Sequence, residues 1–136
     1  MPDVMNALRQ LYEVLYVSTL SSSVSVAEVA IIARHARVAN EQRDITGLLI
    51  FDGQRFCHLV EGPKKTALSL VEKIRMDPRH TDVEVLHHAD IAERRFRAFS
   101  MGYCVVEEVE TLATLHQQGG YTAMATFMKL AATVEL

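Results

Sequence analysis

Three polar side chains stand where the surrounding sequence pattern requires apolar ones. Tyr16 lies in an apolar run, Asn40 ends a helical series of apolar residues, and His58 lies within the stretch RFCHLV. An aromatic hydroxyl, an amide and an imidazole that converge between aliphatic walls can hold a planar ligand through hydrogen bonds. Each residue also has an ordinary interpretation, as a packed tyrosine, a helix-end cap and a satisfied core histidine. The residue types therefore indicate a candidate ligand cleft and leave the ordinary alternatives open.

Hydrophobic periodicity assigns the first two of these residues to a strand and a helix. The alternation over residues 12–18 predicts a strand that is buried on both faces. Apolar residues then recur at helical spacing from Val29 to Asn40, which predicts an amphipathic helix. Ser25 and Glu28, three residues apart, have the spacing of a capping box at the start of that helix. Asn40 is accordingly expected on the inward face of the helix.

The third residue falls in a predicted β-hairpin. The segments ITGLLIF and RFCHLV flank Asp52-Gly53, and both turn residues tolerate a positive φ angle. A two-residue loop at this dipeptide would pair His58 with Gly47 on the preceding strand. A glycine opposite the histidine would leave room for a flat ligand to approach the sheet closely.

The rest of the chain continues with alternating elements. A second amphipathic helix is predicted to end at an Asp-Pro dipeptide, and a strand follows with Val83, Val85 and His87 on one face. A further strand contains Met101, and two short helices flank the glycines at 119–120. The order is an α+β, ferredoxin-like β-α-β-β-α-β core with a fifth strand and a C-terminal helical tail. Because the strands are apolar on both sides, the tail must cover the second face or bind a partner.

Composition limits the classes of function. A chain of 136 residues is the size of one domain, and 49% hydrophobic with 23% charged residues is typical of a globular protein. A net charge of −3 argues against binding to nucleic acid or to an anionic membrane. Two cysteines suit a reducing cytosol, and neither a signal peptide nor a membrane span is indicated. We therefore expect a cytoplasmic protein.

Other chemistry is poorly supported by residue spacing. Cys57 and His58 are adjacent and face opposite sides of a strand, as do the histidines at 87–88, so no metal site is expected. The basic run 94–97 is expected to be solvated, with contact between one of its arginines and a partner as the alternative. A small acylphosphatase-like hydrolase would need an anion-binding loop after the first strand, but residues 19–26 contain neither glycine nor arginine.

Several motifs together resemble one known family. LYEVLYVS, Asn40 ahead of DITGLLIFDGQRF, then HLVEGP, MDPRH and RRFRAFSMGY resemble the BLUF domains, which are blue-light sensors that use FAD. The resemblance covers residues 11–106 in matching order and spacing, and implies a flavin-binding domain there. Residues 107–136 resemble the helical extension of short BLUF proteins, which carry no output enzyme in the same chain. The resemblance implies a photoreceptor module without enzymatic activity.

The resemblance also implies roles for residues near the photoactive centre. Tyr16 matches the tyrosine that donates an electron and a proton to the photoexcited flavin. Asn40 matches the asparagine that hydrogen-bonds the polar edge of the isoalloxazine ring. Met101 matches a methionine near the photoactive centre, and Phe99 stands where many members have tryptophan.

Further positions match the walls and the phosphate end of the family's pocket. Ile32 and Ile74 fit the aliphatic clamp of the ring, and Phe56 is a further cofactor-binding position. Arg79 and His80 fit the end that meets the ribityl phosphate, since a guanidinium fork suits phosphate. The implied cofactor is FAD, with FMN as the alternative.

One central position departs from the family. The family has a glutamine where this chain has His58, and light rearranges the amide of that glutamine between the tyrosine and the flavin. Histidine offers two separated ring nitrogens, so it can bridge the same groups but cannot exchange its donor and acceptor as an amide does. We therefore expect His58 to act with Tyr16 and Met101 at the photoactive centre, with a photocycle that is altered or lost.

Two interpretations of function follow from the resemblance. The first is a flavin-binding photoreceptor that signals through an unidentified output protein, because a chain of this length leaves no room for an effector domain. The second is a light-insensitive binding or scaffold protein with the same fold, with or without a bound flavin. A homo-oligomer is expected in both cases, without nucleic acid or membrane as a partner.

Overall fold

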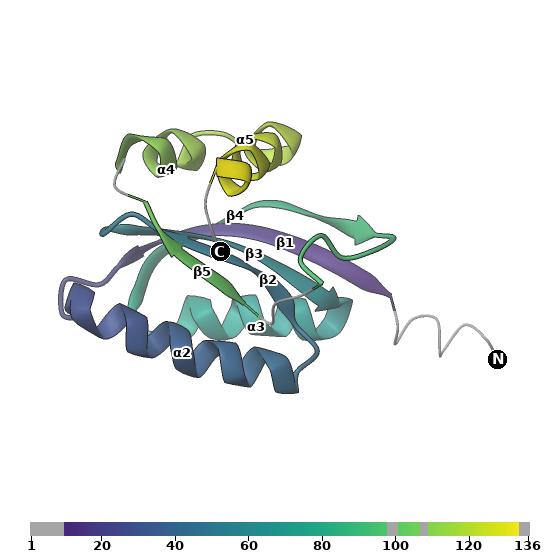
Figure 1. Ribbon diagram of the computed structural model, residues 1–136, viewed down its shortest axis with the longest axis horizontal. Helices are drawn as coiled ribbons and strands as arrows, with labels where there is room; N and C mark the ends of the chain where they lie inside the picture. The colour runs from purple at the N-terminus through teal and green to yellow at the C-terminus, as the bar shows by residue number, and fades with distance from the viewer. Residues whose placement is uncertain (1–9, 98–100, 107–108, 134–136) are drawn as a thin grey trace.

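The computed structural model describes residues 10–97, 101–106 and 109–133 of the chain. A five-stranded sheet in the order β4-β1-β3-β2-β5 lies between two helical layers (Figure 1). No helix in these ranges has both the length and the apolar character that crossing a membrane requires. The predicted order of elements is confirmed. The elements are β1 (Leu11–Leu20), α2 (Val26–Gln42), β2 (Thr46–Phe51), β3 (Arg55–Pro63), α3 (Lys64–Met76), β4 (His80–Ile91), β5 (Gly102–Val105), α4 (Val109–His116) and α5 (Gly120–Thr133).

Strand β1 supplies side chains to both faces of the sheet. It pairs antiparallel with β3 on one side and with β4 on the other. Tyr12, Val14 and Tyr16 pack in one cluster with residues of α3, whereas Leu15 and Val17 pack in the cluster on the opposite face. This alternation confirms the prediction of a strand that is buried on both faces.

Helices α2 and α3 cover one face of the sheet (Figure 1). The inward face of α2 buries Val29, Ala33 and Asn40, as its periodicity predicted. The predicted capping box is wrong: Ser25 is the N-cap, but its side chain makes no capping hydrogen bond. The backbone N–H of Glu28 donates instead to the backbone carbonyl of Ser25, at 3.1 Å. The corresponding buried residues of α3 are Ala67, Leu70 and Val71.

The C-terminal helices cover the other face of the same sheet (Figure 1). Leu112 and Leu115 of α4 and Phe127 of α5 are fully buried, in one cluster with Leu15 and Leu48 of the sheet. Of the two predicted alternatives for the tail, the structure therefore shows packing on its own sheet. The division into domains at residues 106 and 107 stays a prediction.

The β2–β3 hairpin is present, but its predicted register is wrong. Phe51 pairs with Phe56, so four residues rather than two lie between the last paired positions of the two strands. The Asp52 side chain explains the longer loop, because its Oδ1 accepts hydrogen bonds from the backbone N–H groups of Gln54, at 2.8 Å, and of Arg55, at 2.6 Å. The register moves by two residues, which leaves each side chain on its predicted face.

The corrected register changes the role of Gly47. Gly47 pairs with Val60, and His58 pairs with Leu49. Gly47 has a φ angle of +150°, and a Cβ atom there would lie 1.9 Å from the backbone carbonyl oxygen of Leu59. The glycine is therefore required for close contact between two strands. It does not provide space for a ligand opposite His58.

Strand β4 contains an irregularity that overturns the predicted alternation of its side chains. Leu15 pairs with His87, but the next residue, Tyr16, pairs with Val85, so one residue of β4 is unpaired at this point. Val85 packs under α3, whereas His87 contacts Glu13 and lies near Tyr121 of α5 on the opposite face. His87 therefore does not share a face with Val85, contrary to the prediction.

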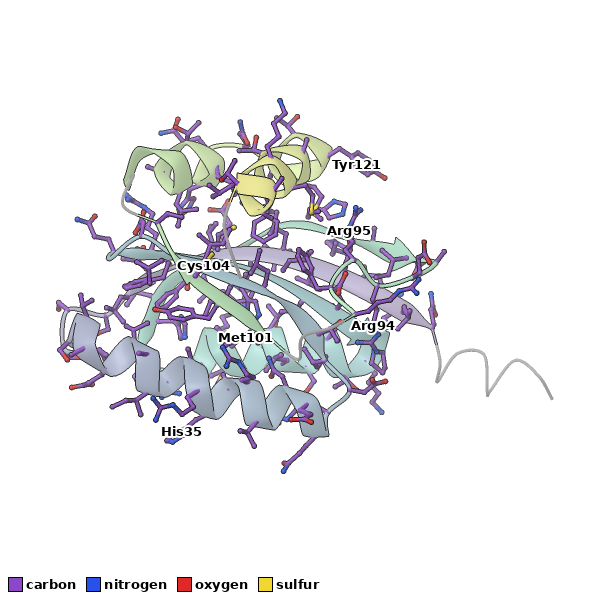
Figure 2. All side chains as sticks on the ribbon, viewed as in Figure 1. His35, Arg94, Arg95, Met101, Cys104 and Tyr121 are labelled. Carbon is purple, nitrogen blue, oxygen red and sulfur yellow. The ribbon has the colours of Figure 1, made fainter. Side chains whose placement is uncertain are left out.

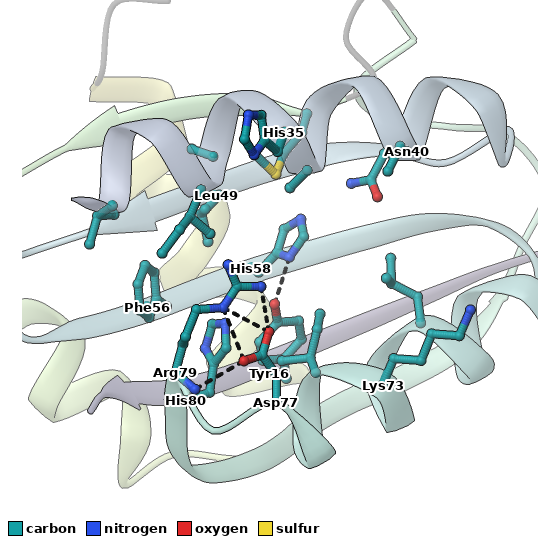
Figure 3. A pocket seen from close by; sticks show the side chains of 18 of the residues that line it. Tyr16, His35, Asn40, Leu49, Phe56, His58, Lys73, Asp77, Arg79 and His80 are labelled. Carbon is teal, nitrogen blue, oxygen red and sulfur yellow. Dashed lines mark hydrogen bonds and ion pairs between the residues drawn. The ribbon is translucent and has the colours of Figure 1, made fainter. Parts of the chain in front are cut away.

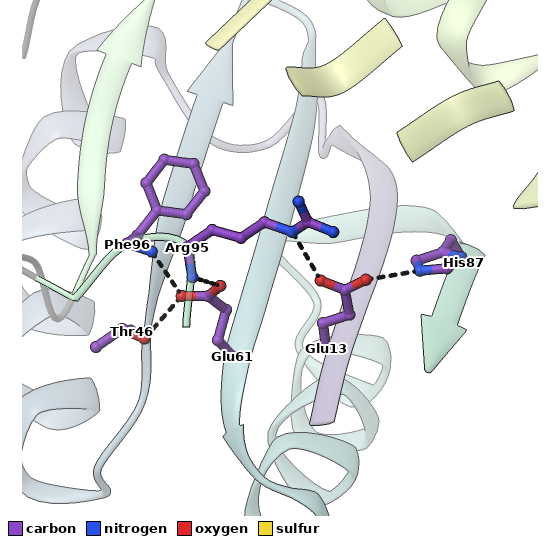
Figure 4. Close-up of polar contacts among 6 residues, drawn as sticks. All are labelled: Glu13, Thr46, Glu61, His87, Arg95 and Phe96. Atoms are coloured by element: carbon purple, nitrogen blue, oxygen red, sulfur yellow. Dashed lines mark hydrogen bonds and ion pairs between the residues drawn. The ribbon is translucent and has the colours of Figure 1, made fainter. Parts of the chain in front are cut away.

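Two buried carboxylates bind the connection between β4 and β5 (Figure 4). Glu61 is fully buried, and its carboxylate accepts hydrogen bonds from the backbone N–H of Arg95, at 2.6 Å, and of Phe96, at 3.1 Å. The hydroxyl of Thr46 also donates to Glu61, at 2.9 Å. Glu13 accepts from Arg95 Nε at 3.1 Å and lies 2.8 Å from His87 Nε2.

The basic run is therefore not simply solvated as predicted. Arg94 and Arg95 lie on the connection between β4 and β5 (Figure 2). The Arg94 guanidinium donates to Thr46 Oγ1 at 2.9 Å and to the backbone carbonyl of Asp44 at 3.0 Å. Only Arg97 conforms to the prediction, in an exposed ion pair with Glu93. The connection that leads to Met101 is thus held to the sheet by charge-assisted hydrogen bonds.

We predict that Glu61→Gln lowers the free energy of unfolding by about 2 kcal/mol, because an amide nitrogen would face donors that now meet a carboxylate oxygen. Urea unfolding monitored by circular dichroism measures the change. The matched control is Glu93→Gln, which removes an exposed ion pair and should change stability by less than about 0.5 kcal/mol. Equal effects of the two substitutions would contradict the assigned role of Glu61.

Candidate functional site

A cavity of about 330 Å³ lies between the sheet and the helices α2 and α3 (Figure 3). Its size and its mainly apolar walls with a few polar groups are typical of a small-molecule site. All the site residues predicted from the sequence that fall within the described ranges line this one cavity. They are Tyr16, Ile32, Asn40, Phe56, His58, Ile74, Arg79, His80 and Met101.

The polar centre of the cavity is a pair of side chains on neighbouring strands. Tyr16 of β1 and His58 of β3 are directly opposite in the antiparallel register, so their side chains stand on the same face. Tyr16 Oη and His58 Nδ1 are 2.8 Å apart, in a hydrogen bond. The two rings meet edge to face, with centroids 5.3 Å apart. The sheet therefore positions the hydroxyl and the imidazole without help from a loop.

Burial keeps both members of this pair uncharged. Tyr16 is 1% exposed and His58 is 3% exposed. Desolvation by burial raises the pKa of the Tyr16 hydroxyl far above its usual value, and the nearby Cys57 thiol adds to the shift. Burial lowers the pKa of His58 to about 3, with a further contribution from His80. A neutral phenol thus faces a neutral imidazole at physiological pH.

The second ring nitrogen of His58 has no hydrogen-bond partner among the described residues. His58 Nε2 is buried, and it lies on the side of the ring away from Tyr16, toward α2 (Figure 3). A buried polar atom without a partner costs about 1–3 kcal/mol, so a ligand that offers a hydrogen-bonding group to Nε2 would remove this cost. Planar heterocycles with polar edges, including flavins, supply such a group, and the aliphatic walls suit their rings.

Asn40 provides a second polar group from the opposite side of the cavity. It lies in the last turn of α2, is 2% exposed, and directs its amide toward the sheet (Figure 3). The backbone carbonyl of Asn40, rather than its side chain, accepts hydrogen bonds from the N–H groups of Arg43 and Ile45. The alternative interpretation of this side chain as a helix-end cap is therefore excluded, and the amide is available to a ligand.

The remaining polar residues gather where α3 ends and β4 begins. Arg79 makes a bidentate contact with Asp77, with Nε 3.0 Å from Oδ1 and Nη2 2.6 Å from Oδ2. This hydrogen bond lowers the pKa of the Asp77 carboxyl. His80 Nδ1 lies 2.9 Å from the hydroxyl of Ser18, and burial lowers the pKa of the imidazole. Both predicted residues line the cavity, but Arg79 already has a carboxylate partner.

Several lining residues were not predicted from the sequence, and two of them, Leu49 and Asp77, lie next to predicted site residues. Leu49 lines the cavity as the β2 neighbour of His58, and only the correct hairpin register identifies it. Asp77 belongs to the quoted MDPRH motif, but its pairing with Arg79 depends on the turn between α3 and β4. Met101 is held by Arg37 Nε, which donates to its backbone carbonyl at 3.0 Å. Phe99 lies outside the described residues.

Comparison with known proteins identifies a sensory family over most of the chain. Residues 11–102 match the BLUF family, described as sensors of blue-light using FAD. The subunit beta of photoactivated adenylate cyclase from Euglena longa is 41% identical over 83 residues, which are 61% of this chain and 10% of the relative. The chain spans about a tenth of the length of the curated relatives it matches.

Solved structures agree over a larger part of the chain. The structure "BlrB - a BLUF protein, dark state structure" has a TM-score of 0.77 and 30% identity, and the match covers 93% of this chain and 99% of BlrB. BlrP1 from Klebsiella pneumoniae has a TM-score of 0.67 and 29% identity, over 74% of this chain and 26% of that protein. The match to BlrB therefore extends over nearly the whole of both chains.

We predict that His58 makes the stability of the protein depend on pH. Because the pKa of His58 is about 3 in the folded protein and about 6.5 when unfolded, the unfolded chain takes up the proton first as pH falls. Stability should therefore fall below pH 6, by up to about 1.4 kcal/mol per pH unit from this group. His58→Gln and His58→Leu should both flatten the profile of urea unfolding between pH 7 and pH 5. His80 remains in every variant, so parallel profiles would show that His58 is not the cause.

Proposed function

The chain belongs to the BLUF family of blue-light sensors that use FAD, and we propose that it binds a flavin, signals through another protein, and responds to light differently from its relatives because of His58. The observation that carries the proposal is the Tyr16–His58 pair, bonded at 2.8 Å, with His58 Nε2 unpartnered among the described residues. The family match supports the flavin and the light response. The histidine at position 58 supports a light response that differs from that of the relatives.

The proposed cofactor would be held by groups from both sides of the cavity. Asn40 would hydrogen-bond the polar edge of the ring, and Ile32 and Ile74 would contact its faces. A bound flavin would supply blue-light absorption and an excited state that can oxidise Tyr16. Before that, Tyr16 retains its proton, since burial raises the pKa of its hydroxyl. Within the described ranges, His58 is the only residue hydrogen-bonded to that hydroxyl. It is therefore the residue whose hydrogen bond would change when Tyr16 is oxidised.

We propose FAD as the cofactor, with FMN as the alternative. Arg79 and His80 line the cavity and would meet the first phosphate, which both flavins carry. The Asp77 carboxylate that now pairs with Arg79 leaves part of the guanidinium fork for an anion, because arginine has five N–H donors. A structure of BlrP1 is described with FMN and cyclic diGMP. That neighbour supports treating the two flavins as competitors in binding experiments.

The proposed output is another protein or domain. The matched relatives include photoactivated adenylate cyclases, in which the matching region is about a tenth of the chain. We propose that residues 11–106 form the flavin-binding domain and residues 107–136 a helical extension that transmits the signal without catalysis. We also propose a homo-oligomer, and a cytoplasmic location on the ground that Cys57 and Cys104 are free thiols.

A second candidate function is a light-insensitive protein with the same fold and the same pocket. The specific observation in its favour is His58 itself, because an imidazole cannot exchange donor and acceptor as the family's amide does. The first candidate predicts flavin binding, and the second allows the protein to exist with or without a flavin. They differ in whether illumination changes the absorption of the bound flavin.

We predict that the protein takes up FAD and shows a weak or absent red shift of the flavin band after blue light, because His58 cannot rearrange as a glutamine does. His58→Gln should create or strengthen a reversible red shift. Absorption spectra of both proteins, recorded in the dark and after illumination, measure the effect, and Tyr16→Phe in the His58→Gln background should abolish it. A preparation that binds neither FAD nor FMN would refute the proposed function. If neither the wild type nor His58→Gln shows a red shift of its bound flavin, His58 is not the cause of the missing light response.

A further inference from the structure

We propose that Tyr16 locks His58 in one tautomer, with the proton on Nε2, so that the cavity presents a fixed hydrogen-bond donor and selects a ligand edge that carries acceptors. Tyr16 is then a positioning residue for the specificity of His58. The inference rests on the proposed function only in taking a flavin as the ligand. The tautomer itself follows from the described residues.

Tyr16 and His58 together have two hydrogen atoms that can form hydrogen bonds. A neutral imidazole has one N–H donor and one acceptor nitrogen, and a phenol has one donor hydrogen. When Tyr16 donates to Nδ1, the hydroxyl hydrogen and the Nδ1 lone pair are both satisfied. The imidazole proton must then be on Nε2. One polar group, the Nε2–H, is left for a ligand.

The opposite arrangement leaves more groups unsatisfied. If Nδ1–H donated to Tyr16 Oη, the hydroxyl hydrogen of Tyr16 would need another acceptor, and no further hydrogen bond of Tyr16 occurs among the described residues. The lone pair of Nε2 would also lack a donor. Each unsatisfied buried group costs about 1–3 kcal/mol, so donation by Tyr16 is favoured.

The charged form of His58 is disfavoured by the same surroundings. An imidazolium would donate from both nitrogens and would deprive the Tyr16 hydroxyl of its acceptor. The neighbours of His58 include Tyr16 of β1, Leu49 of β2, and His80 at the start of β4. None of these carries a negative charge that would stabilise the cation, and the Asp77 carboxylate, which also lines the cavity, is paired with Arg79. The lowered pKa of His58 agrees with a neutral imidazole in the folded protein.

The donor at Nε2 defines the chemistry of the ligand edge. An oxidised isoalloxazine carries a carbonyl oxygen and an unprotonated ring nitrogen side by side, and both are acceptors. A glutamine can present either its oxygen or its nitrogen after rotation of the amide. His58 cannot, because rotating its ring exchanges a nitrogen for a carbon. The selected ligand therefore has acceptors at this edge, and the preference does not change with rotation of the side chain.

Nitrogen-15 NMR of histidine-labelled protein tests the tautomer directly. The wild-type chain should show His58 protonated on Nε2 and unprotonated on Nδ1 from pH 6 to pH 8, with or without added riboflavin. Assignment uses His58→Gln, in which the signals disappear. In Tyr16→Phe the Nδ1–H population should grow, since the donor to Nδ1 is gone. A wild-type Nδ1–H tautomer or an imidazolium would overturn the proposal, as would an unchanged tautomer ratio in Tyr16→Phe.

Riboflavin binding tests the selection of an acceptor edge. His58→Leu, which has no donor, should bind riboflavin about tenfold more weakly than the wild type, and His58→Gln should bind within about threefold. Circular dichroism confirms that each variant is folded. Equal affinity of the wild type and His58→Leu would overturn the selection. If the wild type binds no flavin, the proposed function fails, whereas the NMR experiment still decides the tautomer.

Discussion

The site depends on one cross-strand contact, the hydrogen bond between Tyr16 of β1 and His58 of β3. The two residues are directly opposite in an antiparallel register that runs from Leu11 to Thr19. The distance between their side chains is therefore set by the spacing of two neighbouring strands. Both side chains stand on the face of the sheet that α2 and α3 cover, so these helices form the other walls of the cavity. Burial keeps both groups neutral, because it raises the pKa of Tyr16 and lowers that of His58. The second ring nitrogen of His58 is left for a ligand.

The sheet that carries this contact is buried on both faces. Helices α2 and α3 pack on one face, and α4 and α5 pack on the other (Figure 1). The connection that joins β4 to β5 would otherwise leave backbone N–H groups unpaired, and the Glu61 carboxylate accepts two of them. Arg37 holds the backbone of Met101 at the cavity from the side of α2. Polar contacts thus fix the positions that apolar packing leaves undetermined.

Much of this arrangement could be predicted from the sequence, and the failures have identifiable causes. Periodicity located the strands and helices because each buries a regular face, and the residue types at Tyr16, Asn40 and His58 located the cavity. The hairpin register was wrong because the Asp52 side chain stabilises a longer loop, which a turn dipeptide does not reveal. The contacts of Arg94 and Arg95 were also missed. Their partners are Thr46 and Asp44 for Arg94, and Glu13 and Glu61 for Arg95. These residues are remote in sequence from the basic run and become its neighbours only in the folded protein.

The cavity and the C-terminal helices are on opposite faces, yet they share two strands. Leu15 and Val17 flank Tyr16 on β1, and Cys57 and Leu59 flank His58 on β3; all four pack in the cluster that contains Leu112, Leu115 and Phe127. Since neighbouring residues on a strand point to opposite faces, a change in the spacing of Tyr16 and His58 displaces these flanking residues as well. The interior is close-packed, so such a displacement must be accommodated by α4 and α5. Movement of Tyr16 or His58 is therefore coupled to the packing of α4 and α5 through the shared strands. Among the described residues, none of the tail lines the cavity itself.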